Sequence, residues 1–258
     1  MMKRISLPAL WLASFGALLA SPAWAGDEIQ IYTNDLRKPG ESGVEIHANY
    51  TPRGSSAVDW AGQVPSHHAF NLTPEFSWGL GQGMDWGLYI PTTRGADGHW
   101  HENGIKLRVK RLFNVEKEGE LYYGANFELA WNRPAAVEQH WSGELRTIIG
   151  KDFEHWLLAA NVTLGFDFSG PNRTATPDLA VSLRALRKLS GNWNLGIEHY
   201  AEPGRINALQ SWSNSGETSY LVAEYESGRG WGVQLGVGHG WTGSVDGTVL
   251  KAIVGIDF

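Results

Sequence analysis

Alternation of apolar and polar side chains dominates the chain, and it is clearest between Trp231 and Trp241. The odd-numbered positions carry Trp, Val, Leu, Val, His and Trp, whereas the even-numbered positions carry four glycines and one glutamine. Ten residues of strand rising about 3.3 Å each, tilted by about 40°, span roughly 25 Å. That is the height of the lipid-facing band of an outer-membrane barrel, which has aromatic residues at both edges. The segment therefore predicts a membrane-spanning strand.

Twelve segments alternate in this way and are predicted to be strands. They are residues 43–51, 70–80, 86–93, 104–113, 121–131, 140–149, 153–168, 178–187, 193–201, 220–226, 231–241 and 248–258. Tight turns rich in Gly, Asn and Asp alternate with longer connections, which is typical of a meander with long loops at one rim only. An even number of strands also predicts that both ends of the chain lie at the short-turn rim.

The first 25 residues have the pattern of a secretory signal peptide. Lys3 and Arg4 precede an apolar stretch at 7–20, and Ala23-Trp24-Ala25 forms a small-x-small cleavage site before Gly26. No later stretch has 18 consecutive apolar residues, so no spanning helix is predicted. A chain that crosses a bilayer with strands must close them into a barrel, because every backbone N–H and C=O needs a partner there. We therefore predict an all-β fold for residues 26–258, a closed antiparallel transmembrane β-barrel of about 12 strands in an up-and-down meander.

Composition narrows the classes of partner. The chain has no cysteine, which excludes disulfides and thiolate metal sites, and its net charge of −6 argues against nucleic acid. Several of the 13 tryptophans lie near the ends of predicted strands, as expected for side chains that anchor a barrel in outer-membrane lipids. No cofactor is predicted.

The ending Val254-Gly255-Ile256-Asp257-Phe258 resembles the terminal strand of Gram-negative outer-membrane barrels. The resemblance implies export to the outer membrane of a Gram-negative bacterium, with Phe258 recognised by the barrel-assembly machinery. Blocks at residues 43–46, 73–76 and 88–91 also resemble uncharacterised barrel families that are loosely described as transporters. This second resemblance assigns no functional residue.

The inward faces of the predicted strands carry many charges, including a basic ladder on one strand. Barrels of eight strands are filled by side chains and those of sixteen hold an aqueous channel, so twelve strands allow either a narrow pore or a polar plug. A basic ladder facing acidic residues would select zwitterions or small anions, whereas charges that pair across the lumen would only fill it. The candidates for contact with a small solute are Lys106, Arg108, Lys110, Glu75, Glu128, Glu198, Glu224, Tyr89 and Tyr122.

A lipid hydrolase is the first alternative to a passive channel. His140-Trp141-Ser142 followed by Glu154 resembles the His-x-Ser pair and polar partner of outer-membrane lipid hydrolases. However, a turn at residues 150–152 would place Glu154 opposite Ile148, about 20 Å along the strand from Ser142. A second segment, His199-Tyr200-Ala201, lacks a nucleophile. Catalysis is therefore the less favoured reading.

Histidines in two predicted long loops offer a further alternative. Both loops are predicted at the long-loop rim, so the imidazoles of His67, His68, His99 and His101 could converge there on a divalent ion. A closed structural or binding barrel, functioning through its long loops, is the remaining class. The sequence predicts neither the solute, nor the oligomeric state, nor the fold of the loop at residues 51–68.

Overall fold

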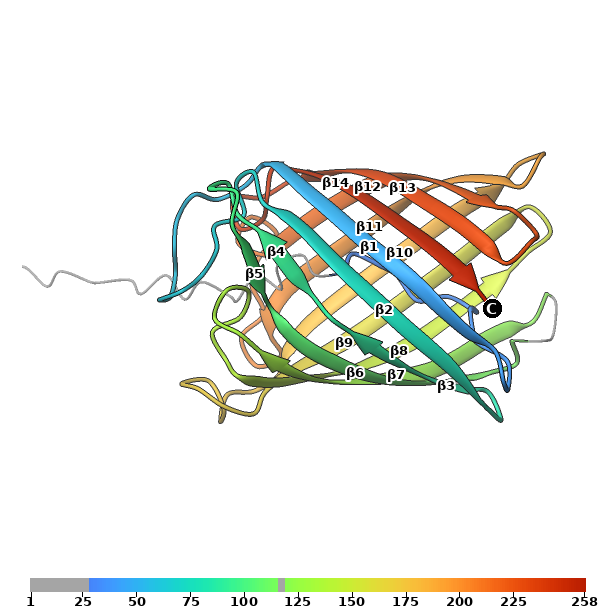
Figure 1. Ribbon diagram of the computed structural model, residues 1–258, viewed down its shortest axis with the longest axis horizontal. Helices are drawn as coiled ribbons and strands as arrows, with labels where there is room; N and C mark the ends of the chain where they lie inside the picture. Colours follow the sequence, from blue (N-terminus) through green and yellow to red (C-terminus); the bar gives the residue numbers. More distant parts are fainter. Residues whose placement is uncertain (1–27, 116–118) are drawn as a thin grey trace, which may run out of the picture.

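A computed structural model describes residues 28–115 and 119–258, so the predicted signal peptide lies outside the described residues. The described chain forms a barrel of tilted strands (Figure 1). Within these residues no helix has the length and apolar character needed to cross a membrane. The strand segments are β1 (Ser42–Arg53), β2 (Phe70–Gly81), β3 (Met84–Tyr89), β4 (Thr92–Arg94), β5 (Trp100–Glu102), β6 (Gly104–Phe113), β7 (Leu121–Asn132), β8 (Trp141–Asp152), β9 (Trp156–Asp167), β10 (Asp178–Lys188), β11 (Trp193–Arg205), β12 (Gly216–Glu226), β13 (Trp231–Gly240) and β14 (Thr248–Asp257).

Each strand pairs antiparallel with its neighbours, and β1 pairs with both β2 and β14, so the sheet closes on itself. The segments β3 and β4 both pair with β2 and together make one barrel strand. The next barrel strand consists of β5 and β6, which pair with β4 and β3 respectively. Twelve barrel strands result, which confirms the predicted closed up-and-down meander.

A β-bulge causes the interruption in these two strands. Tyr89 pairs with Lys106 but Thr92 pairs with Glu102, so the β5–β6 side contains one extra residue. Gly104 lies at this point with φ of +126°, and a Cβ there would lie 2.0 Å from the backbone oxygen of Trp131. The bulge therefore requires glycine at this position.

The predicted sidedness of the strands is also observed. Leu221, Val237 and Leu235 on the outer wall are 70, 57 and 52 % exposed, whereas Asn126 and Asn161 inside are completely buried. Apolar side chains outside and polar side chains inside reverse the arrangement of a soluble barrel. The outer wall is therefore suited to lipid contact.

The predicted turn at residues 150–152 is wrong. The β8 strand continues to Asp152, and the turn follows it, with the Phe153 N–H donating to the Trp156 oxygen at 2.7 Å. Gly150 lies inside the strand opposite Tyr122, whose ring fills the space that a side chain at Gly150 would need. The glycine is therefore a packing feature and not a turn signal. The loop predicted at residues 202–219 is likewise shorter, because β11 and β12 extend into it.

The beginning of β1 and the end of β14 meet at the short-turn rim. Ser42 and Phe258 exchange backbone hydrogen bonds of 2.9 Å there. Residues 28–41, here called the N-terminal segment, do not stay at that rim, however, but run back inside the barrel (Figure 1). The prediction that the chain begins at the short-turn rim is therefore correct for the first strand and for residues 37–41, and wrong for residues 28–36, which lie inside the barrel.

Candidate functional site in the barrel lumen

Side chains of the barrel wall hold the backbone of the N-terminal segment. The Asn161 amide donates to the Tyr32 oxygen at 2.9 Å and accepts from the Tyr32 N–H at 2.8 Å. On another part of the wall, Lys251 donates to the Ile29 oxygen at 2.9 Å. A segment without a neighbouring strand needs such partners, because buried backbone groups left unpaired are costly. The wall therefore provides a specific site for this segment.

Tyr32 is the most extensively bound residue of the N-terminal segment. Its hydroxyl donates to Glu128 at 3.0 Å and lies 2.9 Å from the Tyr89 hydroxyl. Burial raises the pKa of the Tyr32 phenol well above its ordinary value, and the Glu128 carboxylate adds to this shift, so the hydroxyl remains protonated. Basic groups lie near its ring, with centroid distances of 4.6 Å for Arg146, 5.4 Å for Lys110 and 5.7 Å for Arg108. Cation–π attraction therefore adds to the hydrogen bonds.

Ion pairs occupy all three residues of the predicted basic ladder. Arg108 bridges Glu75 and Asp85, both at 2.8 Å, and Lys110 lies 3.5 Å from Asp85. Lys106 reaches the wall residue Glu128 at 3.4 Å, and Glu28 of the N-terminal segment at 3.3 Å. The ladder thus supports the packed interior, and its charge is locally balanced.

The far side of the lumen contains a second paired cluster. Lys251 lies 2.5 Å from Glu198, and Arg184 lies 3.8 Å from Glu198 and also forms an ion pair with Glu224. Tyr122, the remaining candidate, packs against Leu112, Ile148 and Tyr32 in a small apolar cluster. All nine candidates thus point into the barrel, although their contact with a solute stays a prediction.

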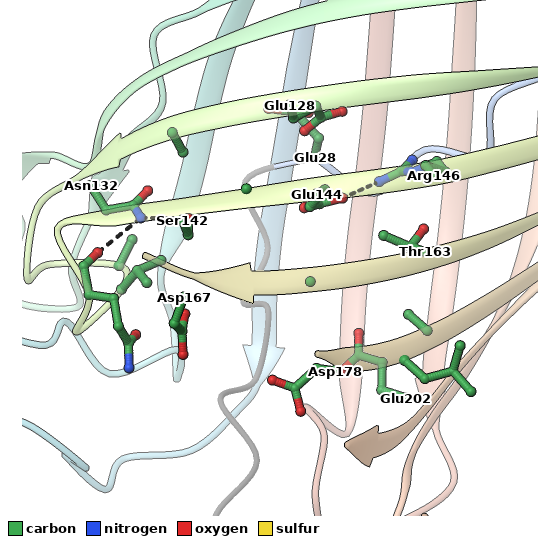
Figure 2. Close-up of a pocket in the computed structure, with 18 of the residues that line it drawn as sticks. Glu28, Glu128, Asn132, Ser142, Glu144, Arg146, Thr163, Asp167, Asp178 and Glu202 are labelled. Carbon is green, nitrogen blue, oxygen red and sulfur yellow. Dashed lines mark hydrogen bonds and ion pairs between the residues drawn. The ribbon is translucent and has the colours of Figure 1, made fainter. Parts of the chain in front are cut away.

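A cavity of about 330 Å³ opens between the N-terminal segment and the long loops (Figure 2). Of the nine candidates, Lys106 and Glu128 line this cavity. Its basic side chains are Lys106 and Arg146, and its carboxylates are Glu28, Asp59, Glu128, Glu138, Glu144, Asp167, Asp178 and Glu202. The cavity is therefore strongly acidic.

Three of these carboxylates lie on adjacent strands and point into the cavity (Figure 2). Asp167 ends β9, Asp178 begins β10, and Glu202 lies near the end of β11. None of the three forms an ion pair with a described residue, whereas Glu144 is paired with Arg146 at 3.0 Å. The sequence does not predict them as site residues, because the ends of alternating strands carry no signal for the path of the loops that follow.

Loop residues also line the cavity, from the loop at residues 54–69, the β7–β8 loop and the β9–β10 loop. Asp59 and Trp60 line the cavity from the loop at residues 54–69, and the Trp60 indole N–H donates to the Pro134 oxygen at 2.6 Å. The Val64 N–H donates to the Ala135 oxygen at 2.9 Å. The loop whose fold the sequence does not predict therefore crosses to the loop between β7 and β8 and narrows the cavity mouth.

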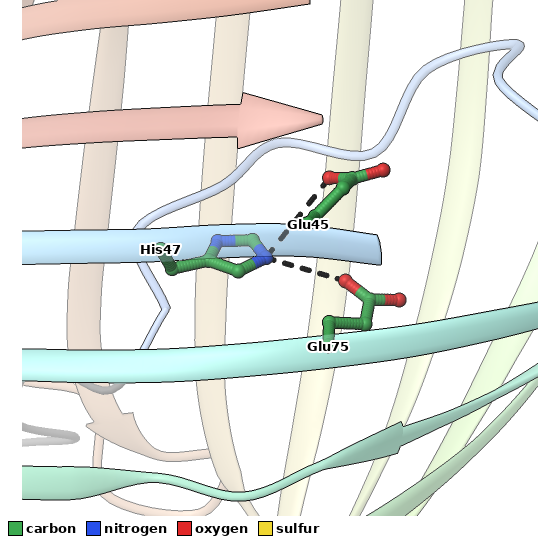
Figure 3. Close-up of side chains that lie close together, drawn as sticks. All are labelled: Glu45, His47 and Glu75. Atoms are coloured by element: carbon green, nitrogen blue, oxygen red, sulfur yellow. Dashed lines mark hydrogen bonds and ion pairs between the residues drawn. The ribbon is translucent and has the colours of Figure 1, made fainter. Parts of the chain in front are cut away.

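Glu45, His47 and Glu75 bring potential metal ligands within 4.8 Å of one another (Figure 3). However, Arg37 lies 3.1 Å from Glu45, and Arg108 lies 2.8 Å from Glu75. Two guanidinium groups thus already balance the carboxylates, so the cluster is an ion-pair network. Among the described residues, the loop histidines His67, His68, His99 and His101 form no group of three or more potential ligands.

The hydrolase site considered as an alternative to the channel is not assembled. The Ser142 hydroxyl accepts a hydrogen bond from Asn132 at 2.8 Å, and His140 Nδ1 lies 3.3 Å from the Asn132 oxygen. Glu154 lies in the β8–β9 turn at the opposite rim. The strand register thus separates the three groups, which rules out the triad that the His-x-Ser spacing suggests.

Comparisons with known proteins address the fold. No protein-family model matches the sequence, and no curated protein matches it. Among solved structures, the chain is similar to the COG4313 outer membrane channel from Pseudomonas putida F1, with 13 % identity, a TM-score of 0.59, and coverage of 90 % of this chain and 100 % of that one. It is also similar to the KdgM porin (9 % identity, TM-score 0.56, covering 84 % and 98 %) and the NanC porin (8 % identity, TM-score 0.53, covering 83 % and 98 %). The chain therefore has the barrel fold found in outer-membrane channels and porins.

Proposed function

We propose that this protein is an outer-membrane channel for small solutes, with its long loops at the cell exterior. The observation that carries the proposal is the acidic cavity, which lies inside a polar lumen and opens toward the long loops. The likeness of the fold to outer-membrane channels and porins supports it. The N-terminal segment occupies part of the lumen below the cavity, so the path for a solute is narrow.

The arrangement of charge favours cationic solutes. The basic ladder is held in ion pairs, whereas Asp167, Asp178 and Glu202 form no ion pair with a described residue, and the basic group nearest to them in the strand register is Arg205, opposite Asp178. Eight carboxylates and two basic groups around one cavity create a negative potential at its mouth, and a low-dielectric wall focuses that potential. This replaces the expectation of zwitterions or small anions, which rests on an unpaired basic ladder.

The volume of the cavity sets the size class of the solute. About 330 Å³ lies at the lower end of the range of small-molecule sites. We therefore expect small organic or inorganic cations to enter, and folded proteins or long polymers to be excluded.

Reversal potentials across a planar bilayer test this proposal. Refolded protein in a KCl gradient should give small discrete conductance steps and a reversal potential of the sign set by K⁺. Chloride selectivity would contradict the cation preference. Folding is checked by the heat-dependent mobility of the protein on gels. Folded protein that shows no conductance would contradict the channel and favour the structural or binding barrel.

A further inference from the structure

Three side chains with catalytic chemistry, His199, Ser219 and Glu217, form a cluster on the outer wall of the barrel, away from the lumen. His199 on β11 lies directly opposite Ser219 on β12 in the strand register. The Ser219 hydroxyl oxygen is 2.9 Å from His199 Nδ1, and Glu217 Oε2 is 3.1 Å from His199 Nε2. The neighbours Glu198 and Tyr220 are buried inside the barrel, so the alternation of each strand directs the three side chains outward. Cross-strand pairing thus supplies the nucleophile that the His199-Tyr200-Ala201 segment lacks.

The burial of the three groups follows the order that a catalytic triad needs. The Glu217 side chain is 5 % exposed, and its other oxygen accepts a hydrogen bond from the Ser215 hydroxyl at 2.5 Å. The His199 side chain is 30 % exposed, and its ring is stacked on Trp212 with an angle of 5° between the planes. A fixed, buried carboxylate therefore orients an imidazole that a substrate can approach.

The surroundings of Ser219 match an acyl lipid lying against the barrel. Two residues further along the strands, toward the middle of the barrel wall, the outward-facing side chains are Ile197, Leu221 and Val237. They lie opposite one another on β11, β12 and β13. These apolar side chains are strongly exposed. The Trp241 indole N–H donates to the Ser219 hydroxyl oxygen at 2.9 Å, which also places a donor next to the point where an oxyanion would form.

We propose that Ser219, His199 and Glu217 hydrolyse a carboxylic ester of an outer-leaflet lipid. The Ser219 oxygen attacks the ester carbonyl carbon while its proton passes to His199 Nδ1. The carbon–oxygen bond to the lipid alcohol breaks, and the alcohol leaves with that proton. Water then attacks the acyl-serine in the same way, which releases the fatty acid and restores the serine. Glu217 is a positioning residue that accepts the Nε2–H bond and stabilises the imidazolium.

The proposal is independent of the channel, and a covalent probe tests it directly. Refolded full-length protein in detergent is treated with a fluorophosphonate, which phosphonylates activated serines, and the labelled peptide is identified by mass spectrometry. We expect one label at Ser219 and none in the Ser219→Ala variant. The Ser213→Ala variant alters a nearby exposed loop serine and should label normally. The Glu217→Gln variant should label more slowly and reach the same final extent.

Hydrolysis is then measured as fatty acid released from mixed micelles of phosphatidylethanolamine or of lipopolysaccharide. Release from one substrate identifies the source of the ester, and we expect it to fall at least about 100-fold in Ser219→Ala. Folding of each variant is checked by its heat-dependent gel mobility. Two results would overturn the proposal: folded wild-type protein that neither labels nor releases fatty acid from either lipid, or release that persists in folded Ser219→Ala.

Discussion

At the scale of single residues, Tyr32 connects the N-terminal segment to several parts of the barrel wall. Its backbone is held by Asn161, its hydroxyl by Glu128, and its ring lies near three basic groups. Contacts of these kinds each contribute about 0.5–2 kcal/mol, so the backbone and side chain of Tyr32 together contribute several kcal/mol to the docking of the segment.

Replacing Tyr32 should therefore loosen the segment. The Tyr32→Ala variant loses the ring and the hydroxyl, at a cost of about 3 kcal/mol, and should show larger or more variable conductance steps. The Tyr32→Phe variant keeps the ring over the basic groups and should lie between Tyr32→Ala and the wild type. Conductance of Tyr32→Ala equal to that of the wild type would show that the segment does not limit the path.

The three cavity carboxylates without an ion pair should determine selectivity. Combining Asp167→Asn, Asp178→Asn and Glu202→Gln removes three carboxyl groups while preserving side-chain size, and should lower the permeability ratio of K⁺ to Cl⁻ several-fold. Glu154→Gln, in an exposed turn at the opposite rim, is the matched control and should leave the ratio unchanged. Equal ratios in the triple variant and the wild type would refute the role of the cavity.

At the scale of strands, two glycines lie under tyrosine rings of the neighbouring strand. Tyr122 lies opposite Gly150, and Tyr220 lies opposite Gly238. A Cβ at Gly238 would come within 2.3 Å of the Tyr220 ring, so each glycine provides the space for an inward aromatic. Period-two alternation predicts the strands and their facing correctly, but it cannot distinguish such a glycine from a turn, which explains the misplaced turn at Gly150.

A double-mutant cycle tests this pairing. Gly238→Ala should destabilise the barrel by about 1–3 kcal/mol because the new methyl group displaces the Tyr220 ring. Tyr220→Ala removes the ring, so the double variant should be less destabilised than the sum of the two single variants. The measurement is the urea dependence of unfolding in detergent, and strictly additive effects would argue against the pairing.

At the scale of the whole molecule, the sequence predicts the barrel but not the contents of its lumen. Alternation predicts whether a side chain points into the lumen or out toward the lipid, and it therefore places all nine candidate residues inside the barrel. The N-terminal segment has no regular pattern, and its partners Asn161 and Lys251 lie far away in the sequence, so nothing local reveals its path. The cavity carboxylates and the Ser219–His199–Glu217 cluster likewise arise from registers between strands, which a single sequence does not specify.

Comparing the conductance of the full-length protein with that of a variant lacking residues 28–36 is the most direct test of a channel narrowed by its N-terminal segment. This deletion removes Tyr32 and Glu28 and leaves Arg37 and its ion pairs at the short-turn rim. We expect small, cation-selective steps for the full-length protein and steps several-fold larger for the deletion variant. Equal conductance in both would contradict a lumen narrowed by the N-terminal segment, and absence of conductance in both folded proteins would contradict the channel itself.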